Sequence, residues 1–355
     1  MSKQKKPMFD FIIGNPPYQG ANHQQLYPDF YLASRKVGQT SCLIFPTGWQ
    51  QPKTANNLGK LNKPEIKTDP QIVAIHNKHN VFSGVPGAEW TNVVLWQKDY
   101  NNGLDGAQLV HTEGVATPTL LLWDKSQIEK PIEIQTLASL VMSHPSFVSA
   151  QSITSVRKPY GFSTDVMDDY DKYNLPPFFE TQQNDNDFAV YGLRKRKQVI
   201  LFAPANYPVP KKSPVINKYK VFIGKAWGNF SDAYLGGAYA DIVIASPNEI
   251  CTENYLESGS FDDFEMVQKH AKYLMTRFAR ALLYMHKHTQ DNSKEKWAAV
   301  PIQDYSESWW DLSIEEIDEK LMDKYAVPQN IRDFVKNHIQ TKTEANIVNF
   351  RGAIC

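Results

Sequence analysis

The stretch that decides the fold is FDFIIGNPPYQ, residues 9–19. Residues 9–13 form a compact apolar run that stops at Gly14, which predicts a buried strand of a parallel sheet. A polar, proline-rich loop at residues 15–18 follows at once. Open α/β sheets bind ligands beyond the carboxyl ends of their parallel strands, so this loop lies where a binding site is expected. We expect Gly14 to permit a tight turn there.

The loop has the groups that chemistry at the N6 amino group of adenine needs. The lone pair of N6 is delocalised into the ring, so the amino group is a poor nucleophile. The amide oxygen of Asn15 and the backbone carbonyl of Pro16 can both accept hydrogen bonds from N6, which returns electron density to the nitrogen. Pro17 stiffens this carbonyl, and Tyr18 offers an aromatic face for a base taken out of the helix. An ordinary loop capped by Asn15 is the alternative.

Outward from this loop, the sequence predicts an α/β region followed by an α+β region. Apolar residues at helical spacing predict a helix between Leu26 and Val37. After about residue 108, proline, glycine and polar residues interrupt the chain more often. The further predicted strands lie at residues 41–45, 72–75, 92–96, 199–202, 219–223 and 242–245, with one long helix at 261–288 and one or two short helices at 311–339.

Composition and charge limit the classes of protein that remain. The 355 residues are enough for two domains, and 42% hydrophobic residues are enough for packed cores. Residues 145–230 carry 12 Lys and Arg against 7 Asp and Glu, whereas residues 231–355 carry 13 against 20, so the middle stretch is the basic one. The three cysteines have neither metal-ligand nor redox spacing, and no apolar run is long enough to span a membrane. We therefore expect a cytoplasmic protein without a metal site.

FDFIIGNPPYQ resembles motif IV of amino-group DNA methyltransferases, in the Eco57I-like restriction–modification group. Segments similar to other blocks of this family follow in the same order over nearly the whole chain. They are LIFPTGWQ (43–50), NVFSGVPGAEWTNVVLW (80–96), VRKPYGFSTD (156–165), YKVFIGKAWG (219–228) and TQDNSKEKWAAVPIQDYSESW (289–309). The resemblance implies a site-specific adenine-N6 methyltransferase that uses S-adenosyl-L-methionine and acts on double-stranded DNA.

The resemblance also implies roles for single residues. Asn15, Pro16, Pro17 and Tyr18 would hold the flipped adenine, and Phe82 would be the second aromatic residue stacked on the base. A core position is the alternative for Phe82, and a solvated charged surface is the alternative for the basic residues of the recognition region. The expected DNA-contacting residues are Arg157, Lys158, Tyr160, Arg194, Lys195, Arg196, Lys197, Lys211 and Lys212.

The resemblance implies three segments along the chain. Residues 1–110 would be the C-terminal part of the catalytic domain, with a partial Rossmann-like sheet; residues 111–150 would connect it to an α+β target-recognition domain at 151–345. In this family the Gly-rich turn that holds S-adenosylmethionine lies upstream of motif IV. Only 14 residues precede Asn15 and they contain no such turn. We therefore expect the strand at 9–13 to have unpaired edges, and the cofactor half to come from a second polypeptide or to be lost in a remnant gene.

Other interpretations stay open. The chain could be a catalytically inactive DNA-binding or specificity subunit, or a decayed methylase. Asn-Pro-Pro-Tyr loops also serve glutamine amides of proteins and amino groups of RNA, although the long segment after residue 145 favours duplex DNA. Trp49 either lines the same cleft or packs in the core. His76 and His79, with His23 upstream, are expected to be surface histidines and not metal ligands.

Overall fold

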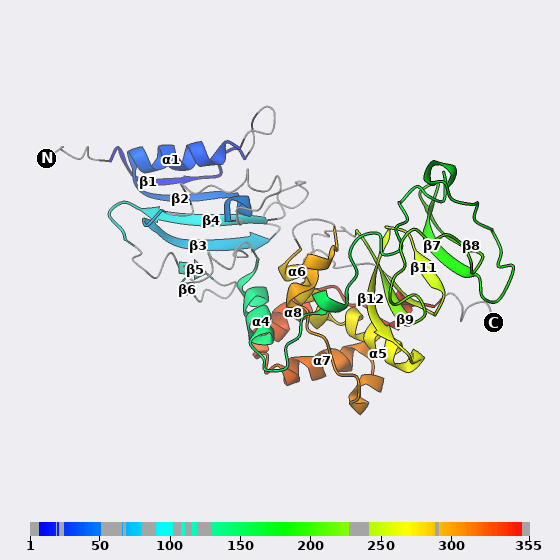
Figure 1. Ribbon diagram of the computed structural model, residues 1–355. Helices are drawn as coiled ribbons and strands as arrows, with labels where there is room; N and C mark the ends of the chain where they lie inside the picture. The colour runs from blue at the N-terminus through cyan, green and yellow to red at the C-terminus, as the bar shows by residue number, and fades with distance from the viewer. Residues whose placement is uncertain are drawn as a thin grey trace. The chain divides into compact units, whose positions relative to one another are not determined.

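The computed structural model divides the chain into two compact units, Met1–Thr136 and Leu137–Cys355 (Figure 1). Each unit has an apolar core of its own. The segment boundaries predicted after residues 110 and 150 stay a prediction. The residues that the structure describes are 7–18, 20, 25–50, 66, 69–79, 90–101, 108–110, 116–118, 130–226, 241–287 and 291–349.

The first unit is built on a six-stranded mixed sheet with the order β1-β2-β4-β3-β5-β6. β1 runs parallel to β2, and α1 (Tyr27–Val37) connects the two. β4 runs antiparallel to both of its neighbours, so the expectation of a parallel sheet holds only for the pairs β1–β2 and β3–β5. The helix and the four strands predicted for this region are confirmed. The strands are β1 (Phe9–Gly14), β2 (Gly38–Pro46), β3 (Ile72–His79), β4 (Trp90–Gln97), β5 (Gln108–Val110) and β6 (Ala116–Pro118).

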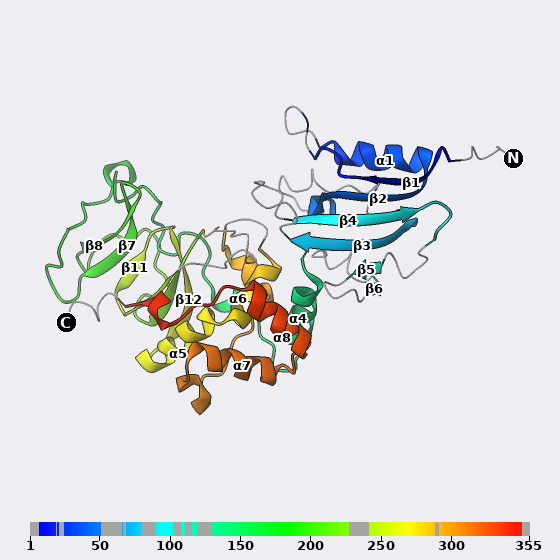
Figure 2. The same cartoon turned by 180° about the vertical axis from the view of Figure 1, so that it is seen from behind.

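Strand β1 is the outermost strand of this sheet, as both views show (Figure 1, Figure 2). The side chains of Phe9, Phe11 and Ile13 lie on one face and are 51%, 73% and 82% exposed. Ile12 points the opposite way and packs against the core of the unit. The prediction of a buried strand is therefore wrong, because within the described residues β1 has a neighbour on one edge only and no layer covers its outer face. Of the expected unpaired edges of β1, the described residues present one, since the other edge pairs with β2.

The core of the first unit forms where α1 packs on the sheet. The ring of Tyr27 stacks on Phe45 of β2 at 5.1 Å, and Tyr31 meets the same ring edge-on at 6.2 Å. Trp49 lies in the 3-10 turn η2 (Thr47–Gln50) after β2, is fully buried, and also packs edge-on against Phe45. The packing interpretation of Trp49 is thus confirmed.

A buried acid ties α1 to the turn before β3. Asp69 accepts a hydrogen bond from the hydroxyl of Tyr31 at 2.5 Å, and Arg35 Nε lies 3.1 Å from the same carboxylate oxygen. The Arg35 guanidinium also lies 5.8 Å from the ring centre of Trp96. Burying an acid costs free energy unless its charge is paired, and here both partners come from the helix.

The second unit combines two sheets with a group of helices. One sheet has the order β12-β9-β10-β13 and the other the order β11-β7-β8. Buried side chains from both sheets, among them Val190, Leu201, Phe222 and Val243, form one core. The three strands predicted here are confirmed. The bounds are β7 (Phe188–Arg194), β8 (Lys197–Ala203), β9 (Tyr219–Gly224), β10 (Ile242–Ala245), β11 (Glu249–Cys251), β12 (Tyr255–Phe261) and β13 (Ile347–Val348).

The long helix predicted at residues 261–288 is wrong, because the chain breaks at Thr276 into α5 (Phe264–Met275) and α6 (Arg277–Met285). Thr276 has an extended backbone, with φ −61° and ψ 150°. Its hydroxyl accepts a hydrogen bond from Ala279 N at 3.1 Å and donates one to Tyr273 O at 2.7 Å. One side chain thus ends the first helix and caps the second.

The remaining helices complete the second unit. The two short helices expected at residues 311–339 are confirmed as α7 (Ile314–Lys324) and α8 (Gln329–His338). α4 (Ile132–Met142) spans the division between the two units. None of the helices in the described ranges has the length and apolar character needed to cross a bilayer. Short 3-10 turns are η4 (Ala150–Ile153), η5 (Asp171–Tyr173), η6 (Lys294–Ala299), η7 (Ser308–Asp311) and η8 (Glu344–Asn346).

Candidate functional site

The loop of residues 15–18 leaves the carboxyl end of β1, next to the parallel strand β2. The last residue of β1, Gly14, is in register with Leu43 of β2. Asn15 and Pro17 are exposed, Pro16 is buried and Tyr18 is half-buried. The loop therefore presents the Asn15 side chain at the edge where open α/β sheets bind ligands, and Pro16 fixes the backbone beside it.

Tyr18 is held in place and is not a free surface ring. It packs against the core of the first unit, and its backbone carbonyl accepts a hydrogen bond from Leu26 N at 3.1 Å. Burial raises the pKa of its phenol, and the neighbouring Asn15 side chain opposes that rise. The Asn15 and Tyr18 side chains thus lie together, with Tyr18 positioned by packing.

Gly14 is the residue predicted to permit a tight turn after β1. Its backbone does not have a positive φ, and a Cβ atom added there would make only an ordinary contact with Leu43, at 3.7 Å. The expectation that Gly14 permits a tight turn therefore gains no support from its backbone or its surroundings. Nothing among the described residues explains the absence of a side chain at this position.

Three other candidates of the first unit are Phe82, His76 and His79. Phe82 lies outside the described residues, and so does the side chain of His79. His76 is half-buried on β3. The part of the chain that the structure describes contains no group of three or more His, Cys, Asp or Glu side chains placed to hold a metal ion.

In the second unit, Arg157 and Lys158 share one acidic partner. Each lies 3.6 Å from Glu253, and Lys158 also donates a hydrogen bond to Ser163 at 2.8 Å. Burial acts to raise the pKa of Glu253, but the hydroxyl of Thr164 and nearby lysine charges lower it overall. Both cations remain about half exposed, at 54% and 43%. They are oriented by an acid and still accessible to a phosphate group.

Tyr160 is a core residue. It is fully buried, and its backbone carbonyl accepts a hydrogen bond from Lys211 N at 3.0 Å. The expectation that its ring contacts DNA is therefore wrong, because no face of the ring is available for stacking. The contact does bring the two basic segments at 157–158 and 211–212 together. Gly161 allows the close approach, with φ +84° and Pro210 only 2.8 Å from where a Cβ would lie.

The run Arg194, Lys195, Arg196 and Lys197 forms the tip of the β7–β8 hairpin. Arg194 is in register with Lys197, and the two central residues have φ 49° and 63°. A two-residue hairpin turn with both φ values positive is of type I′, which favours Asn and Gly. Here Lys and Arg occupy these strained positions. Asp168 accepts a hydrogen bond from Lys195 N at 2.9 Å, and Arg194 pairs with Glu180. Both views show the hairpin away from α5 to α8 (Figure 1, Figure 2).

The structure therefore sorts the candidate residues into three places. The Asn15 loop belongs to the first unit. In the second unit, Arg157, Lys158 and Lys211 lie on adjacent segments, while the basic hairpin tip is a separate group. The exposed Lys212 follows Lys211. The sequence did not point to Glu253 or to the nearby buried Glu257. Both acids lie far along the chain from the basic segment at 157–158, and no local motif marks either of them.

No protein-family model matches the sequence, and no curated protein matches it. Among solved structures, the chain is similar to the type IIG restriction endonuclease BpuSI, with a TM-score of 0.41 and 11% identity over 88% of this chain and 45% of that one. It is also similar to the type IIL restriction–modification enzyme MmeI in complex with DNA, with a TM-score of 0.33 and 12% identity over 90% and 50% of the two chains.

A third similar structure is the methyltransferase subunit of a type I restriction–modification system from Streptococcus thermophilus. Its TM-score is 0.23, with 14% identity over 35% of this chain and 32% of that one. The chain thus spans half or less of the length of the restriction–modification enzymes that it resembles in structure.

Proposed function

We propose that this chain is the adenine-holding and target-recognition part of a DNA adenine-N6 methyltransferase of a restriction–modification system. The observation that carries the proposal is the loop Asn15-Pro16-Pro17-Tyr18 at the carboxyl end of β1. Its exposed amide lies next to a tyrosine that packing holds in place. This arrangement suits an exocyclic amino group placed beside a fixed hydrogen-bond acceptor.

The chain's own contribution to the reaction is to bind and polarise the base. Asn15 Oδ1 and the carbonyl of Pro16 accept hydrogen bonds from N6 of a flipped adenine, and the ring of Tyr18 borders the base. By resemblance, Phe82 is the second aromatic neighbour of the adenine. None of these roles requires a metal ion.

The methyl donor implied by the resemblance is S-adenosyl-L-methionine, and the described residues of the first unit do not fit a site for it. Such a site needs a glycine-rich turn with open space in front of the backbone. Gly20 and Gly38 are closely packed, by Leu26 and by Ile12, and neither has a positive φ. We propose that the cofactor-binding part joins the sheet along the open edge of β1, where backbone groups are available to another strand.

DNA contact is assigned to the basic residues that stay accessible in the second unit. The hairpin tip formed by residues 194–197 and the pair Arg157 and Lys158 would contact phosphate groups. Lys211 and Lys212 extend the second of these surfaces. Tyr160 supports it from within the core.

The proposal is tested by expressing the chain, together with the genes that flank it, in a bacterial host without adenine methylation. Single-molecule sequencing of the host DNA would detect N6-methyladenine at one sequence motif. Asn15→Ala removes the amide acceptor and should reduce the methylated fraction at least about a hundredfold, by analogy with the loss of one polarising hydrogen bond. Asn330→Ala, at an exposed position on α8, is the matched control and should leave methylation unchanged.

A second function, DNA binding without catalysis, is favoured by the poor fit of the described residues to the cofactor. Under this alternative the purified chain binds duplex DNA at a specific sequence, and no methylated adenine appears in the host. Equal methylation by the wild type and Asn15→Ala would reject the role assigned to the loop.

A further inference from the structure

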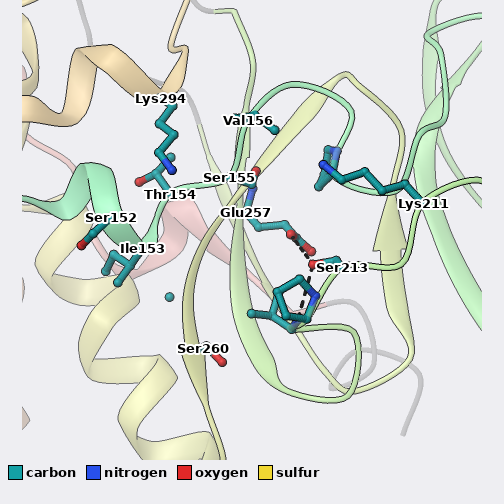
Figure 3. Close-up of a pocket in the computed structure, with 14 residues that line it drawn as sticks. Ser152, Ile153, Thr154, Ser155, Val156, Lys211, Ser213, Glu257, Ser260 and Lys294 are labelled. Carbon is teal, nitrogen blue, oxygen red and sulfur yellow. Dashed lines mark hydrogen bonds between the residues drawn. The ribbon is translucent and has the colours of Figure 1, made fainter.

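The second unit contains a cavity of about 370 Å³, and Lys211 is the one residue of its lining to which the proposed function gives a role (Figure 3). Its walls come from the end of η4 and the segment after it, from the loop that begins at Lys211, from β12 and from the first residue of η6. Ile153 and Val156 supply apolar surface, and Ser213 and Ser260 supply hydroxyl groups. This volume is in the range of pockets that enclose small ligands.

A buried acid, Glu257 of β12, lines this cavity. The residue is 3% exposed, and Ser213 donates a hydrogen bond to its Oε2 at 2.9 Å. Oε1 makes no hydrogen bond within the described part of the chain, although the Tyr160 hydroxyl lies close to the carboxylate, and Oε2 keeps a second lone pair. Burial raises the pKa of Glu257, and the hydroxyls of Tyr160 and Ser213 oppose the rise. A buried carboxylate with unused hydrogen-bonding capacity is stabilised when a donor reaches it.

Two lysines lie on the walls of the same cavity. In Figure 3 the side chain of Lys211 extends from the right toward the centre of the view, and that of Lys294 extends downward at the left and ends beside Thr154. The charge of Lys211 lowers the pKa of Glu257, so the two groups are within electrostatic reach. Lysine ammonium groups at a pocket wall suit phosphate. The cavity thus combines an acceptor for N–H groups with cations for an anion.

We propose that this cavity binds a nucleotide whose base carries an amino group, with the amino group donating to Glu257 and the phosphate contacting Lys211 and Lys294. Adenine, cytosine and guanine present such a group, and thymine does not. The cavity and its charges do not depend on the proposed function. Only the source of the nucleotide does, since a DNA-recognition part would take an amino-bearing base of its target strand.

The binding test uses isothermal titration calorimetry of the full chain with dAMP, dCMP, dGMP, dIMP and TMP. We expect at least one amino-bearing nucleotide to bind about tenfold more tightly than TMP, and dGMP to bind more tightly than dIMP, which lacks only the amino group. In Glu257→Gln this preference should fall to about threefold or less. Glu265→Gln, on an exposed part of α5, is the matched control.

A second pair of variants tests the site without touching its buried acid. Lys211→Met and Lys294→Met alter partly exposed side chains, so the fold should persist even if Glu257→Gln unfolds. Each should weaken the binding of nucleotides about tenfold and leave the binding of the corresponding nucleosides unchanged. Equal binding of all five nucleotides, no binding at all, or unaltered binding by both lysine variants would overturn the proposal.

Oligonucleotides identify the source of the nucleotide. A thymine strand with one central amino-bearing base, free or in a duplex, should bind more tightly than an all-thymine strand, and Glu257→Gln should abolish the difference. Binding of free nucleotides without this difference would support the site and reject its link to DNA. Neither result depends on methylation, so failure here is separate from failure of the proposed function.

Discussion

His270 is buried as a neutral ring, and each of its two ring nitrogens lies next to a hydroxyl group. Its Nε2 lies 2.9 Å from Ser258 Oγ and its Nδ1 lies 2.6 Å from Tyr305 Oη. Burial lowers the pKa of His270 from 6.5 to about 3. Between these two pH values the unfolded chain binds a proton that the folded chain does not, so the folded state loses stability as the pH falls below 6.5.

We therefore predict that the free energy of unfolding of the second unit decreases by up to about 1.4 kcal/mol per pH unit below pH 6.5 through this residue. Urea unfolding between pH 5 and pH 8 would measure the slope. The variant His270→Gln has no titrating ring. It should lower the free energy of unfolding at pH 8, and its free energy of unfolding should depend less on pH, by an amount that corresponds to about one bound proton. An unchanged slope would show that other groups cause the acid sensitivity.

At the residue scale, the sequence predicted the place of the Asn15 loop after a strand, but it did not predict which aromatic side chains are buried. The Asn15 loop was found because its residue types and its place after an apolar run are both local. Tyr160 was misassigned because an aromatic residue beside two cations is equally compatible with a surface or a core. Trp49 offered the same two alternatives. Burial depends on contacts with residues far away in the chain, such as the contact of Lys211 with Tyr160.

Among the elements, the β7–β8 hairpin combines strain with charge. Lys195 and Arg196 have positive φ values at a turn that Asn and Gly adopt at lower cost. Replacing strained residues by ones that suit the turn stabilises a protein, whereas removing two cations weakens phosphate contact. A variant that replaces both residues should therefore gain stability and lose affinity for DNA.

We predict that the double variant Lys195→Asn and Arg196→Gly raises the free energy of unfolding by about 1 kcal/mol and weakens duplex DNA binding. The slope of log affinity against log salt should decrease by about 2. Fluorescence anisotropy at several salt concentrations and chemical unfolding would measure the two effects. Unchanged DNA affinity would remove the hairpin tip from the binding surface.

The periodicity of apolar residues predicted most of the helices and strands. It failed at Thr276, where one side chain ends a helix that the apolar pattern continues. Apolar residues continue at helical spacing from Phe264 through Phe278 to Met285, so the pattern gives no sign of a break. Thr276 ends α5 and caps α6, although threonine is also tolerated inside helices. Likewise, the apolar run of β1 is compatible with a central strand or an outer one, and only its neighbours decide.

On the scale of the whole molecule, the described part of β1 leaves an apolar strand uncovered. Met8, Phe9, Phe11 and Ile13 are all more than half exposed, at 73%, 51%, 73% and 82%. An unpaired edge with such side chains associates with other strands. No sequence pattern places the parts of the Glu257 cavity together either, since its walls come from residues as far apart in the chain as Ser152 and Lys294.

We predict that the purified chain associates with itself in a concentration-dependent way, and that Phe11→Lys suppresses the association. A lysine on an edge strand opposes strand pairing, and its position is exposed, so the fold should tolerate it. Sedimentation velocity would measure the oligomer distribution, with Phe30→Lys on the exposed side of α1 as control. If the wild type and Phe11→Lys associate equally, the chains do not associate through β1.

The open edge of β1 also bears on the lifetime of the chain in a cell. Uncovered apolar strands are surfaces that chaperones hold and proteases degrade. The abundance of this chain will therefore follow the supply of whatever strand covers β1, because unpaired copies are removed. Such turnover would keep the loop of residues 15–18 from accumulating without its complement.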